Sequence, residues 1–213
     1  FKDGEQYARI AESVRGKDVF IVQSTNQPDS HFKELLMLVH GAYHASAERV
    51  TAVIPYLGYS RQDWKDKSRA PVSVISDAKA LEGQCVDRVL FLDVHSNVIT
   101  GVYMARDILT DHLWARPEFV RYLKKHEKEW KSDRPLVVAA PDSNAVKLAR
   151  AYARNLDAEG IVIIDKFRPR PGEAAVMNVV GDVNGKDVLI ADDMIDSAKT
   201  ICNAAEAFMA RGA

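Results

Sequence analysis

The sequence predicts an α/β protein of two domains, each built on a mainly parallel sheet flanked by helices. Short apolar runs without polar alternation, such as 188–191, are typical of parallel strands covered on both faces. Segments with helical spacing of apolar residues follow most of these runs, and this alternation occurs in two series. We therefore expect two domains, residues 1–113 and 114–213.

The composition is that of a globular protein with room for a large core. The 213 residues are 47% hydrophobic and carry a net charge of -1 at pH 7. No Lys/Arg-rich run suggests nucleic acid as a partner, and no apolar stretch approaches membrane-spanning length. The first residues do not resemble a signal peptide. We expect a soluble, cytoplasmic protein.

The ends of the chain and its cysteines lead to two further expectations. The sequence starts abruptly at Phe1 and stops at Ala213, where a strand would be expected, so we interpret it as truncated at both ends. Cys85 and Cys202 lack metal-ligand spacing and occur in helical patterns, which predicts free, partly buried thiols.

The first series of strands and helices occupies the N-terminal half. Apolar runs bounded by turn residues predict its strands, and apolar residues at helical spacing behind a capping residue predict its helices. In order, we expect a strand at 18–23, a helix from Asp29 or Ser30 to just before Ser46, a strand at 49–54, a helix at 72–82 and a strand at 88–92. The pattern weakens over 98–113.

Three histidines in this series have a spacing or position that suits a metal ion. His40 and His44 lie four residues apart on the first helix, but no third ligand is near in the sequence, which favours an ordinary surface or interface role. His95 follows the strand at 88–92 and is interpreted either as a metal ligand or phosphate contact, or as a local hydrogen bonder.

A charged loop at 60–71 (SRQDWKDKSRAP) follows the strand at 49–54. A solvated loop is the ordinary interpretation of such a run. Its position favours a ligand-binding role, because open α/β sheets bind ligands at the carboxyl ends of their strands.

The second series begins with a helix that starts at Pro117 and runs through His126. The elements expected after it are a strand at 136–140, a turn at 141–144, a helix from Val146, a strand at 160–164, a basic, proline-stiffened segment at 165–172, and strands at 177–183 and 188–191. The Asn184-Gly185 turn between the last two strands suggests that they form a hairpin-like pair.

An acidic turn follows the last strand and leads into a helix from Ala198. Asp192, Asp193 and Asp196 are followed by Ser197 and Thr200. Open amides and hydroxyls at a helix start can hold a phosphate, and carboxylates just before it suit sugar hydroxyls or magnesium. The alternative is that these residues only end a strand and cap a helix.

Cations and carboxylates thus gather at the expected strand ends, which fits phosphoryl chemistry. Transfer of a phosphoryl-type group depends mainly on positioning and charge neutralisation, for which Lys, Arg and magnesium ligands are suited. The chain has neither a G-x-x-x-x-G-K-[ST] loop nor a kinase Gly-rich loop.

Motifs of one known family extend over nearly the whole chain: Phe1-x-Asp3-Gly4-Glu5, Glu12-Ser13-Val14-Arg15-Gly16-Lys17, Arg61-Gln62-Asp63, Lys65-Asp66-Lys67-Ser68-Arg69-Ala70-Pro71, Asp93-x-His95, Asp165-Lys166 and Asp192-Asp193-Met194-Ile195-Asp196. With them, the chain resembles the ribose-phosphate pyrophosphokinases, which make phosphoribosyl pyrophosphate from ATP and ribose 5-phosphate. The resemblance implies two phosphoribosyltransferase-like domains. The Arg61-Gln62 loop and the N-terminal motif distinguish this family from the phosphoribosyltransferases, which share the acidic turn.

The resemblance also implies the site residues. Lys166 and Arg168, on a flexible loop, would stabilise the transition state, and His95 and Asp142 would hold Mg²⁺. The residues implied for ATP are Phe1, Asp3 and Glu5 from a neighbouring subunit, with Arg61, Gln62 and Asp66. Those implied for ribose 5-phosphate are Asp192, Asp193 and Asp196 at the hydroxyls, and Ser197, Ala198, Lys199 and Thr200 at the phosphate.

The family works as dimer-based homo-oligomers, typically hexamers, so the resemblance implies such an assembly. Its implied activity is Mg-dependent transfer of the pyrophosphoryl group of ATP to the 1-hydroxyl of ribose 5-phosphate. The alternative is a catalytically weak regulatory homologue that binds active subunits, and a third hypothesis is a phosphoribosyltransferase.

The chain departs from the family pattern at two substrate loops. The loop Pro141-Asp142-Ser143-Asn144-Ala145 lacks the family's two glycines, so side chains stand where bare backbone is usual. Lys199 replaces a small residue in the 5-phosphate loop, where it either adds a cation or disturbs the turn.

Overall fold

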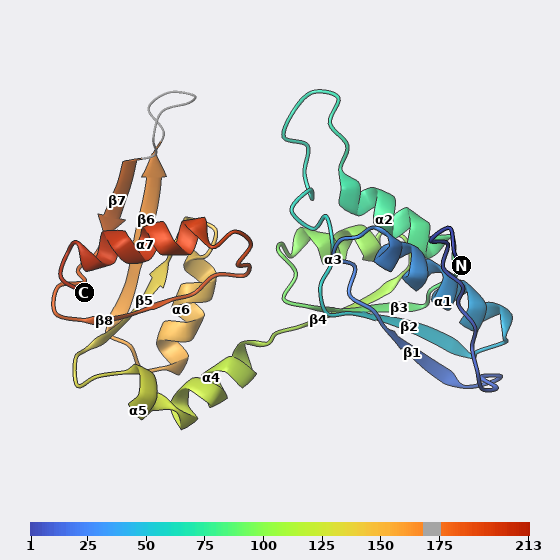
Figure 1. The fold of residues 1–213 in the computed structure, drawn as a ribbon, viewed down its shortest axis with the longest axis horizontal. Helices are drawn as coiled ribbons and strands as arrows, with labels where there is room; N and C mark the ends of the chain where they lie inside the picture. The colour runs from blue at the N-terminus through green and yellow to red at the C-terminus, as the bar shows by residue number, and fades with distance from the viewer. Residues whose placement is uncertain (168–175) are drawn as a thin grey trace. The chain divides into compact units, whose positions relative to one another are not determined.

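The computed structural model describes residues 1–167 and 176–213, and the chain divides into two compact units, 1–114 and 115–213. Each unit contains its own four-stranded sheet (Figure 1). Both sheets are mainly parallel and flanked by helices, which confirms the predicted α/β class.

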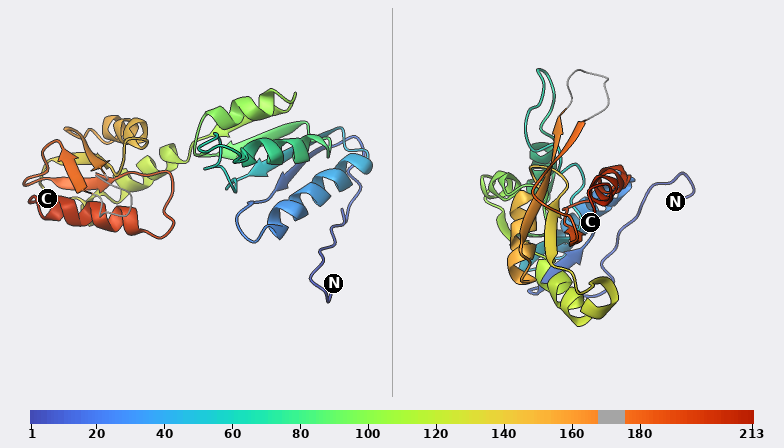
Figure 2. Two further views of the ribbon diagram at one scale, coloured as in Figure 1. Left: turned by 90° about the horizontal axis from the view of Figure 1, so that it is seen from above. Right: turned by 90° about the vertical axis from the view of Figure 1, so that its left-hand side faces the viewer.

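The sheet of the first unit is wholly parallel, with strand order β1-β2-β3-β4. Its elements are β1 (Asp18–Val22), α1 (Ser30–His44), β2 (Arg49–Ile54), α2 (Ser73–Glu82), β3 (Arg88–Leu92), α3 (Val98–Met104) and β4 (Leu109–Leu113). Right-handed crossovers between strands in sequential order place all their helices on one face. The views of Figures 1 and 2 agree that α1, α2 and α3 lie on the same face of this sheet.

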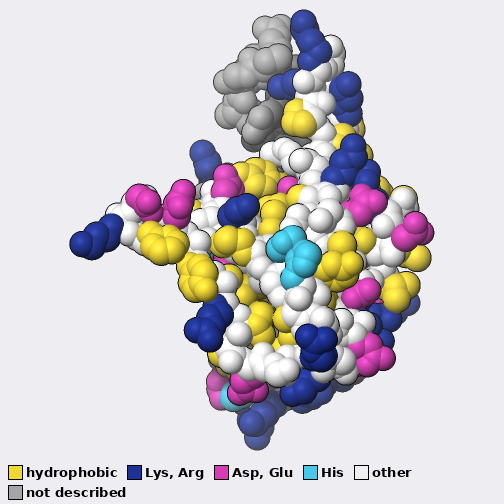
Figure 3. All heavy atoms as spheres, turned by 90° about the vertical axis from the view of Figure 1, so that its right-hand side faces the viewer, with side chains coloured by type: hydrophobic (Ala, Val, Ile, Leu, Met, Phe, Trp, Pro, Cys, Tyr) yellow, Lys and Arg dark blue, Asp and Glu magenta, His cyan; other side chains and the backbone are white. Residues whose placement is uncertain are grey.

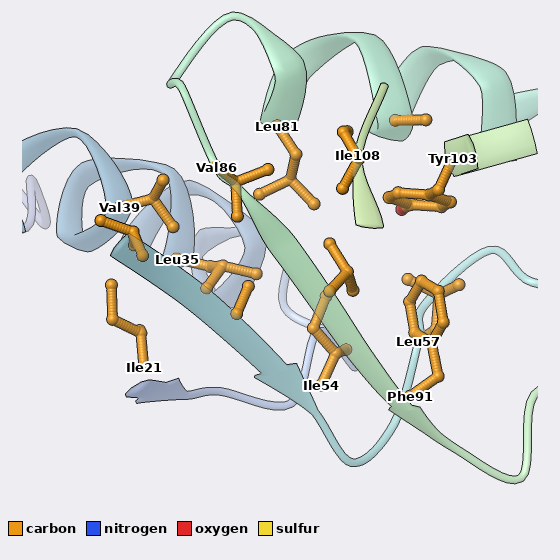
Figure 4. Close-up of a cluster of buried hydrophobic side chains, with 14 of the residues drawn as sticks. Ile21, Leu35, Val39, Ile54, Leu57, Leu81, Val86, Phe91, Tyr103 and Ile108 are labelled. Atoms are coloured by element: carbon orange, nitrogen blue, oxygen red, sulfur yellow. The ribbon is translucent and has the colours of Figure 1, made fainter. Parts of the chain in front are cut away.

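The core of the first unit fills the space between these helices and the sheet. Leu35 from α1, Leu81 from α2 and Tyr103 from α3 are fully buried against strand residues that include Ile54 and Phe91 (Figure 4). The rings of Tyr103 and Phe91 meet edge to face at 5.0 Å. On the opposite face of the sheet, the large side chains of β1 and β4 stay exposed: Phe20, Val22, Leu109 and Leu113.

The second unit has strand order β7-β6-β5-β8, with β5 parallel to β6 and β8 and with β7 antiparallel to β6. Its elements are α4 (Arg116–Lys125), α5 (Glu127–Trp130), β5 (Leu136–Ala140), α6 (Val146–Asn155), β6 (Gly160–Phe167), β7 (Val176–Val180), β8 (Asp187–Ile190) and α7 (Lys199–Met209). Ala149 and Ala153 of α6 pack in one core cluster, and Ala204 and Phe208 of α7 pack in another. Neighbouring residues of β5 alternate between the two clusters, so the two helices cover opposite faces.

The predicted hairpin between the last two strands is wrong. β7 pairs antiparallel with β6, in the register Ile164↔Val179, while β8 pairs in parallel with β5. The two strands therefore lie at opposite edges of the sheet, although an Asn184-Gly185 turn separates them in the sequence.

Two segments contain more regular structure than the sequence predicts. The span 98–113 holds both α3 and β4, which were missed because α3 has only seven residues and the middle of β4 is polar (TDH). β6 continues through Phe167, three residues beyond the prediction, because its end pairs with β7. Lys166 thus lies in a strand rather than on a loop.

The two cysteines are free, as predicted, but both are exposed rather than partly buried. Cys85 lies beyond the end of α2 and Cys202 lies on the outer side of α7, away from the buried Ala204 and Phe208. Among the described residues, no helix combines the length and the apolar character needed to cross a bilayer.

Candidate functional site

The acidic turn lies at the carboxyl edge of the second sheet. The backbone N–H of Ala191 donates to the carbonyl of Ala139 (2.9 Å), which continues the β5–β8 pairing one residue past β8. This bond anchors the following Asp192, whose side chain is half-buried, whereas Asp193 and Asp196 are exposed.

Asp142 and Asp192 follow the neighbouring parallel strands β5 and β8, so both lie at the same edge of the sheet. Burial first, and then the hydrogen bond and negative charge of Asp193 and the charge of Asp142, raise the pKa of Asp192 to about 6. Asp192 Oδ1 also accepts the backbone N–H of Asp193 (2.9 Å). The turn thus brings carboxyl groups close together, and a bound cation would stabilise their ionised form.

The loop after β5 closes without glycine. Asp142 Oδ1 accepts the backbone N–H groups of Asn144 (2.9 Å) and Ala145 (3.2 Å) just before α6. No residue from 141 to 145 has a positive φ, so ordinary side chains fit this backbone. Both bonds use Oδ1, and Oδ2 remains as a carboxylate oxygen for a cation.

The turn before α7 places its unusual backbone conformation at Ala198. Its φ of 60° lies in the left-handed region, and α7 begins at the next residue, Lys199, which is not among the positive-φ residues. The methyl group of Ala198 cannot cap the helix, and the side chains of Ser197, Lys199 and Thr200 are exposed. A helix start of this kind presents backbone N–H groups and hydroxyls to solvent.

In the first unit, the charged loop is fastened to the start of α2 through Gln62. The backbone N–H of Gln62 donates to the carbonyl of Tyr59 (2.8 Å), and its side-chain Oε1 accepts the hydroxyl of Ser73, the first residue of α2. Arg61 and Asp66 are exposed on either side of this attachment.

Thr25 ties the loop after β1 to the loop after β2. Its Oγ1 accepts the N–H of Gly58 (2.8 Å), and its own N–H donates to the carbonyl of Tyr56 (2.8 Å). A Cβ on Gly58 would lie 2.2 Å from the carbonyl oxygen of Thr25, so only glycine fits this approach.

His95 follows β3 in a loop that is held by β4. The N–H of Asp93 donates to the carbonyl of Leu113 (2.9 Å), and that of Val94 donates to Nε2 of His112 (3.2 Å). Burial lowers the pKa of His112, and the negative charge of Asp93 opposes this effect. The net lowering favours the neutral imidazole, in which Nε2 can accept the hydrogen bond. The sequence prediction missed His112, because three consecutive polar residues in the middle of β4 hide the strand pattern.

The other candidate residues are less constrained. Phe1, Asp3 and Glu5 are exposed, and Asp3 Oδ1 accepts the N–H of Glu5 (3.0 Å). Lys166 pairs with Met177 in the β6–β7 ladder, and Arg168 lies outside the described residues.

Each unit therefore assembles its own part of the candidate set at the ends of parallel strands. Asp142 and Asp192 come together in the second unit, while Gln62 and His95 belong to loops of the first. Over residues 1–167 and 176–213, no group of three or more His, Cys, Asp or Glu side chains could hold a metal ion. Magnesium does not require one, because it is usually bound by one or two carboxylates, with waters and substrate phosphates completing its shell.

Two family descriptions match this chain. Residues 1–83 match the N-terminal domain of ribose phosphate pyrophosphokinase, and residues 111–213 match the phosphoribosyl transferase domain. The two matches follow the order in which the two sheets occur along the chain.

Individual relatives agree with these matches. Proteins named ribose-phosphate pyrophosphokinase from Agrobacterium fabrum and Mesorhizobium japonicum are each 46% identical over all of this chain, which covers 66% and 67% of their respective lengths. The crystal structure of phosphoribosylpyrophosphate synthetase from Mycobacterium smegmatis matches with a TM-score of 0.89 and 34% identity, over 100% of this chain and 67% of that one. The chain thus spans about two thirds of the length of these relatives.

Proposed function

The chain belongs to the ribose-phosphate pyrophosphokinase family, and on this premise we propose that it is part of a ribose-phosphate diphosphokinase. The reaction is Mg-dependent transfer of the pyrophosphoryl group of ATP to the 1-hydroxyl of ribose 5-phosphate, with AMP as the second product. The observation that carries the proposal is the meeting of Asp142 and Asp192 at one sheet edge, beside the exposed start of α7.

In this proposal, the turn after β8 binds ribose 5-phosphate. Asp192, Asp193 and Asp196 accept hydrogen bonds from the ribose hydroxyls, since ionised carboxylates are strong acceptors. Ser197, Ala198 and Thr200 hold the 5-phosphate through hydroxyls and backbone N–H groups at the start of α7.

Lys199 adds a positive charge to the phosphate-binding turn. Because the left-handed conformation falls on Ala198, Lys199 keeps an ordinary helical backbone and its exposed ammonium group is free to reach an anion. This geometry favours the added-cation interpretation over a disturbed turn.

Arg61, Gln62 and Asp66 hold ATP in the first unit. The attachment of Gln62 to Ser73 fixes the backbone beside Arg61, so that the guanidinium is presented from a defined position. Phe1, Asp3 and Glu5 complete the nucleotide site from a neighbouring subunit of a dimer-based homo-oligomer, which we propose to be hexameric and cytoplasmic.

Magnesium, when bound, neutralises charge on the reacting phosphates. Oδ2 of Asp142, which takes part in neither hydrogen bond to Asn144 and Ala145, and the raised pKa of Asp192 fit a cation in the second unit. His95 supplies a half-buried ligand in the first. Lys166 and Arg168 donate hydrogen bonds to the triphosphate and stabilise the negative charge that develops during transfer.

None of the relatives described above is named as a regulatory protein, and no feature of the described residues favours the regulatory alternative. The deciding assay incubates the full-length protein with Mg²⁺, ATP and ribose 5-phosphate and measures AMP. We expect AMP at a rate well above that of an Asp192→Ala control. A rate equal to that of the control would refute the proposed activity.

A further inference from the structure

Two histidines that the proposed function does not use lie one turn apart on α1. His40 and His44 are both exposed, and their ring centroids are 4.3 Å apart with planes tilted by 56°. Residues four apart share one face of a helix, so the helix itself holds the two rings together. Figure 3 shows adjoining histidine side chains, in cyan, open to solvent on the face that it draws.

The separation of the rings suits a shared metal ion. Imidazole nitrogen binds Zn²⁺ at about 2.0–2.1 Å, so two imidazoles that share one ion must lie side by side on adjacent coordination positions. The rings of His40 and His44 lie side by side, with their planes tilted rather than stacked flat. Because both side chains stand on one face of the same helix, their rotation can bring one nitrogen of each ring to a common ion without a change of the helix.

The surroundings favour a positive ion at this position. His44 is the last residue of α1, where the carbonyl ends of the helix dipole carry partial negative charge. The ring of Tyr43 lies edge-on to that of His44, with the centroids 5.3 Å apart. Because no third His, Cys, Asp or Glu joins them in the described part of the chain, the remaining positions around the ion would be taken by water.

We propose that His40 and His44 form a two-histidine site for a divalent transition-metal ion such as Zn²⁺, Ni²⁺ or Cu²⁺. Imidazole nitrogen suits these ions, and neither His40 nor His44 is among the residues proposed above to hold magnesium, so this is a separate site. Affinity should follow the general order in which Cu²⁺ exceeds both Ni²⁺ and Zn²⁺. The proposal does not depend on the pyrophosphokinase activity.

The first test titrates the full-length protein with Zn²⁺ by calorimetry at neutral pH, with excess Mg²⁺ present to occupy the oxygen sites. We expect the wild-type protein to bind one Zn²⁺ per chain at this site. In His40→Asn and in His44→Asn, the Kd for Zn²⁺ should rise roughly tenfold or more, because each variant loses the chelate. His31→Asn is the control, because His31 already contacts the carbonyl of Asn26 through Nδ1 (2.9 Å) and lies outside the pair.

Electron paramagnetic resonance of bound Cu²⁺ identifies the ligands directly. With one equivalent of Cu²⁺, the spectrum of the wild-type protein should show hyperfine splitting from two imidazole nitrogens, and either single variant should show one. Unchanged Zn²⁺ affinity in the His40→Asn/His44→Asn double variant, or an equal loss in His31→Asn, overturns the proposal. So does a wild-type protein that binds no Zn²⁺. Because both histidines are exposed, circular dichroism of the variants should match the wild type.

Discussion

Thr25 and Gly58 join the loops that follow β1 and β2. The Oγ1 of Thr25 accepts the N–H of Gly58 at 2.8 Å, and the carbonyl oxygen of Thr25 occupies the space that a side chain on Gly58 would need. The charged loop that begins at Ser60 therefore starts from a fixed point, because both strands hold the backbone just before it.

Gly58→Ala should destabilise the first unit. A Cβ would lie 2.2 Å from backbone oxygen, which cannot move like the end of a flexible side chain, so we expect a loss of about 1–3 kcal/mol in the free energy of unfolding. Urea unfolding measures this change. Gly101→Ala is the matched control, since nothing lies within 4 Å of its Cβ position and alanine favours the α3 helix. Equal stability of the two variants would contradict the close approach.

Asp77→Asn should stabilise the protein near neutral pH. Burial first, and then the charge of Asp29, raise the pKa of Asp77 from 3.8 to about 6. A raised carboxyl pKa means that the folded state holds the proton more tightly. This contribution to stability is present below pH 3.8 and is lost as the pH rises to about 6.

Asp77 is only about half-buried, so solvent screening reduces the effect. We expect Asp77→Asn to raise the free energy of unfolding by about 1–2 kcal/mol at about pH 7.5. The gain should disappear at about pH 4. Urea unfolding at the two pH values tests this, with the exposed Asp133→Asn as the control. A gain that is the same at both pH values would rule out the raised pKa as its cause.

Ala198→Gly should raise the melting temperature. Alanine has a steric cost at the φ of 60° that glycine avoids, so we expect the free energy of unfolding to rise by about 0.5–1 kcal/mol. Lys199→Gly should instead lower the free energy of unfolding by about as much, because it places glycine in the α7 helix, which begins at this residue. If Lys199→Gly stabilises and Ala198→Gly does not, the left-handed residue has been assigned to the wrong position.

Lys199→Met should weaken binding of ribose 5-phosphate. The ammonium group lost at the start of α7 is expected to contribute one charge-assisted contact, so the Kd should rise about tenfold. The difference between wild type and variant should shrink at high salt, since an exposed charge is screened. Calorimetric titration at two salt concentrations measures both effects. Tighter binding by Lys199→Met would mean that the lysine obstructs the site.

Cation binding at the acidic turn should weaken as the pH falls through about 6. The pKa of Asp192 is raised to about 6, so its carboxyl is ionised at pH 7.5 but mostly protonated at about pH 5. Titration with Mn²⁺ in place of Mg²⁺ at these two pH values should show weaker binding at the lower one. Asp192→Asn should remove most of this pH dependence, whereas the exposed Asp133→Asn should leave it intact.

Local patterns were sufficient for much of the fold. The apolar runs at β2, β3 and β5 and the helical spacing in α1 and α7 predicted these elements, because strand and helix periodicity depend on residues close together in the chain. α3 and β4 were missed since one is short and the other is polar in the middle, and each is stabilised by packing against neighbours rather than by its own pattern.

The candidate site was likewise predicted from the sequence only in part. The acidic turn and the charged loop were identified from their composition and from their positions after strands. The roles proposed for them remain predictions. The contribution of His112 was not predicted, because its bond to the N–H of Val94 joins residues 18 positions apart.

The sequence by itself determined the family, the α/β class and the chemical types of the residues that gather at strand ends. Only the tertiary structure decided that β7 pairs with β6 rather than β8, that Asp142 lies beside Asp192, and that Ala198 rather than Lys199 takes the left-handed conformation. The physical reason is that strand pairing and turn closure are set by contacts between distant segments. Those contacts cannot be inferred from the preferences of neighbouring residues.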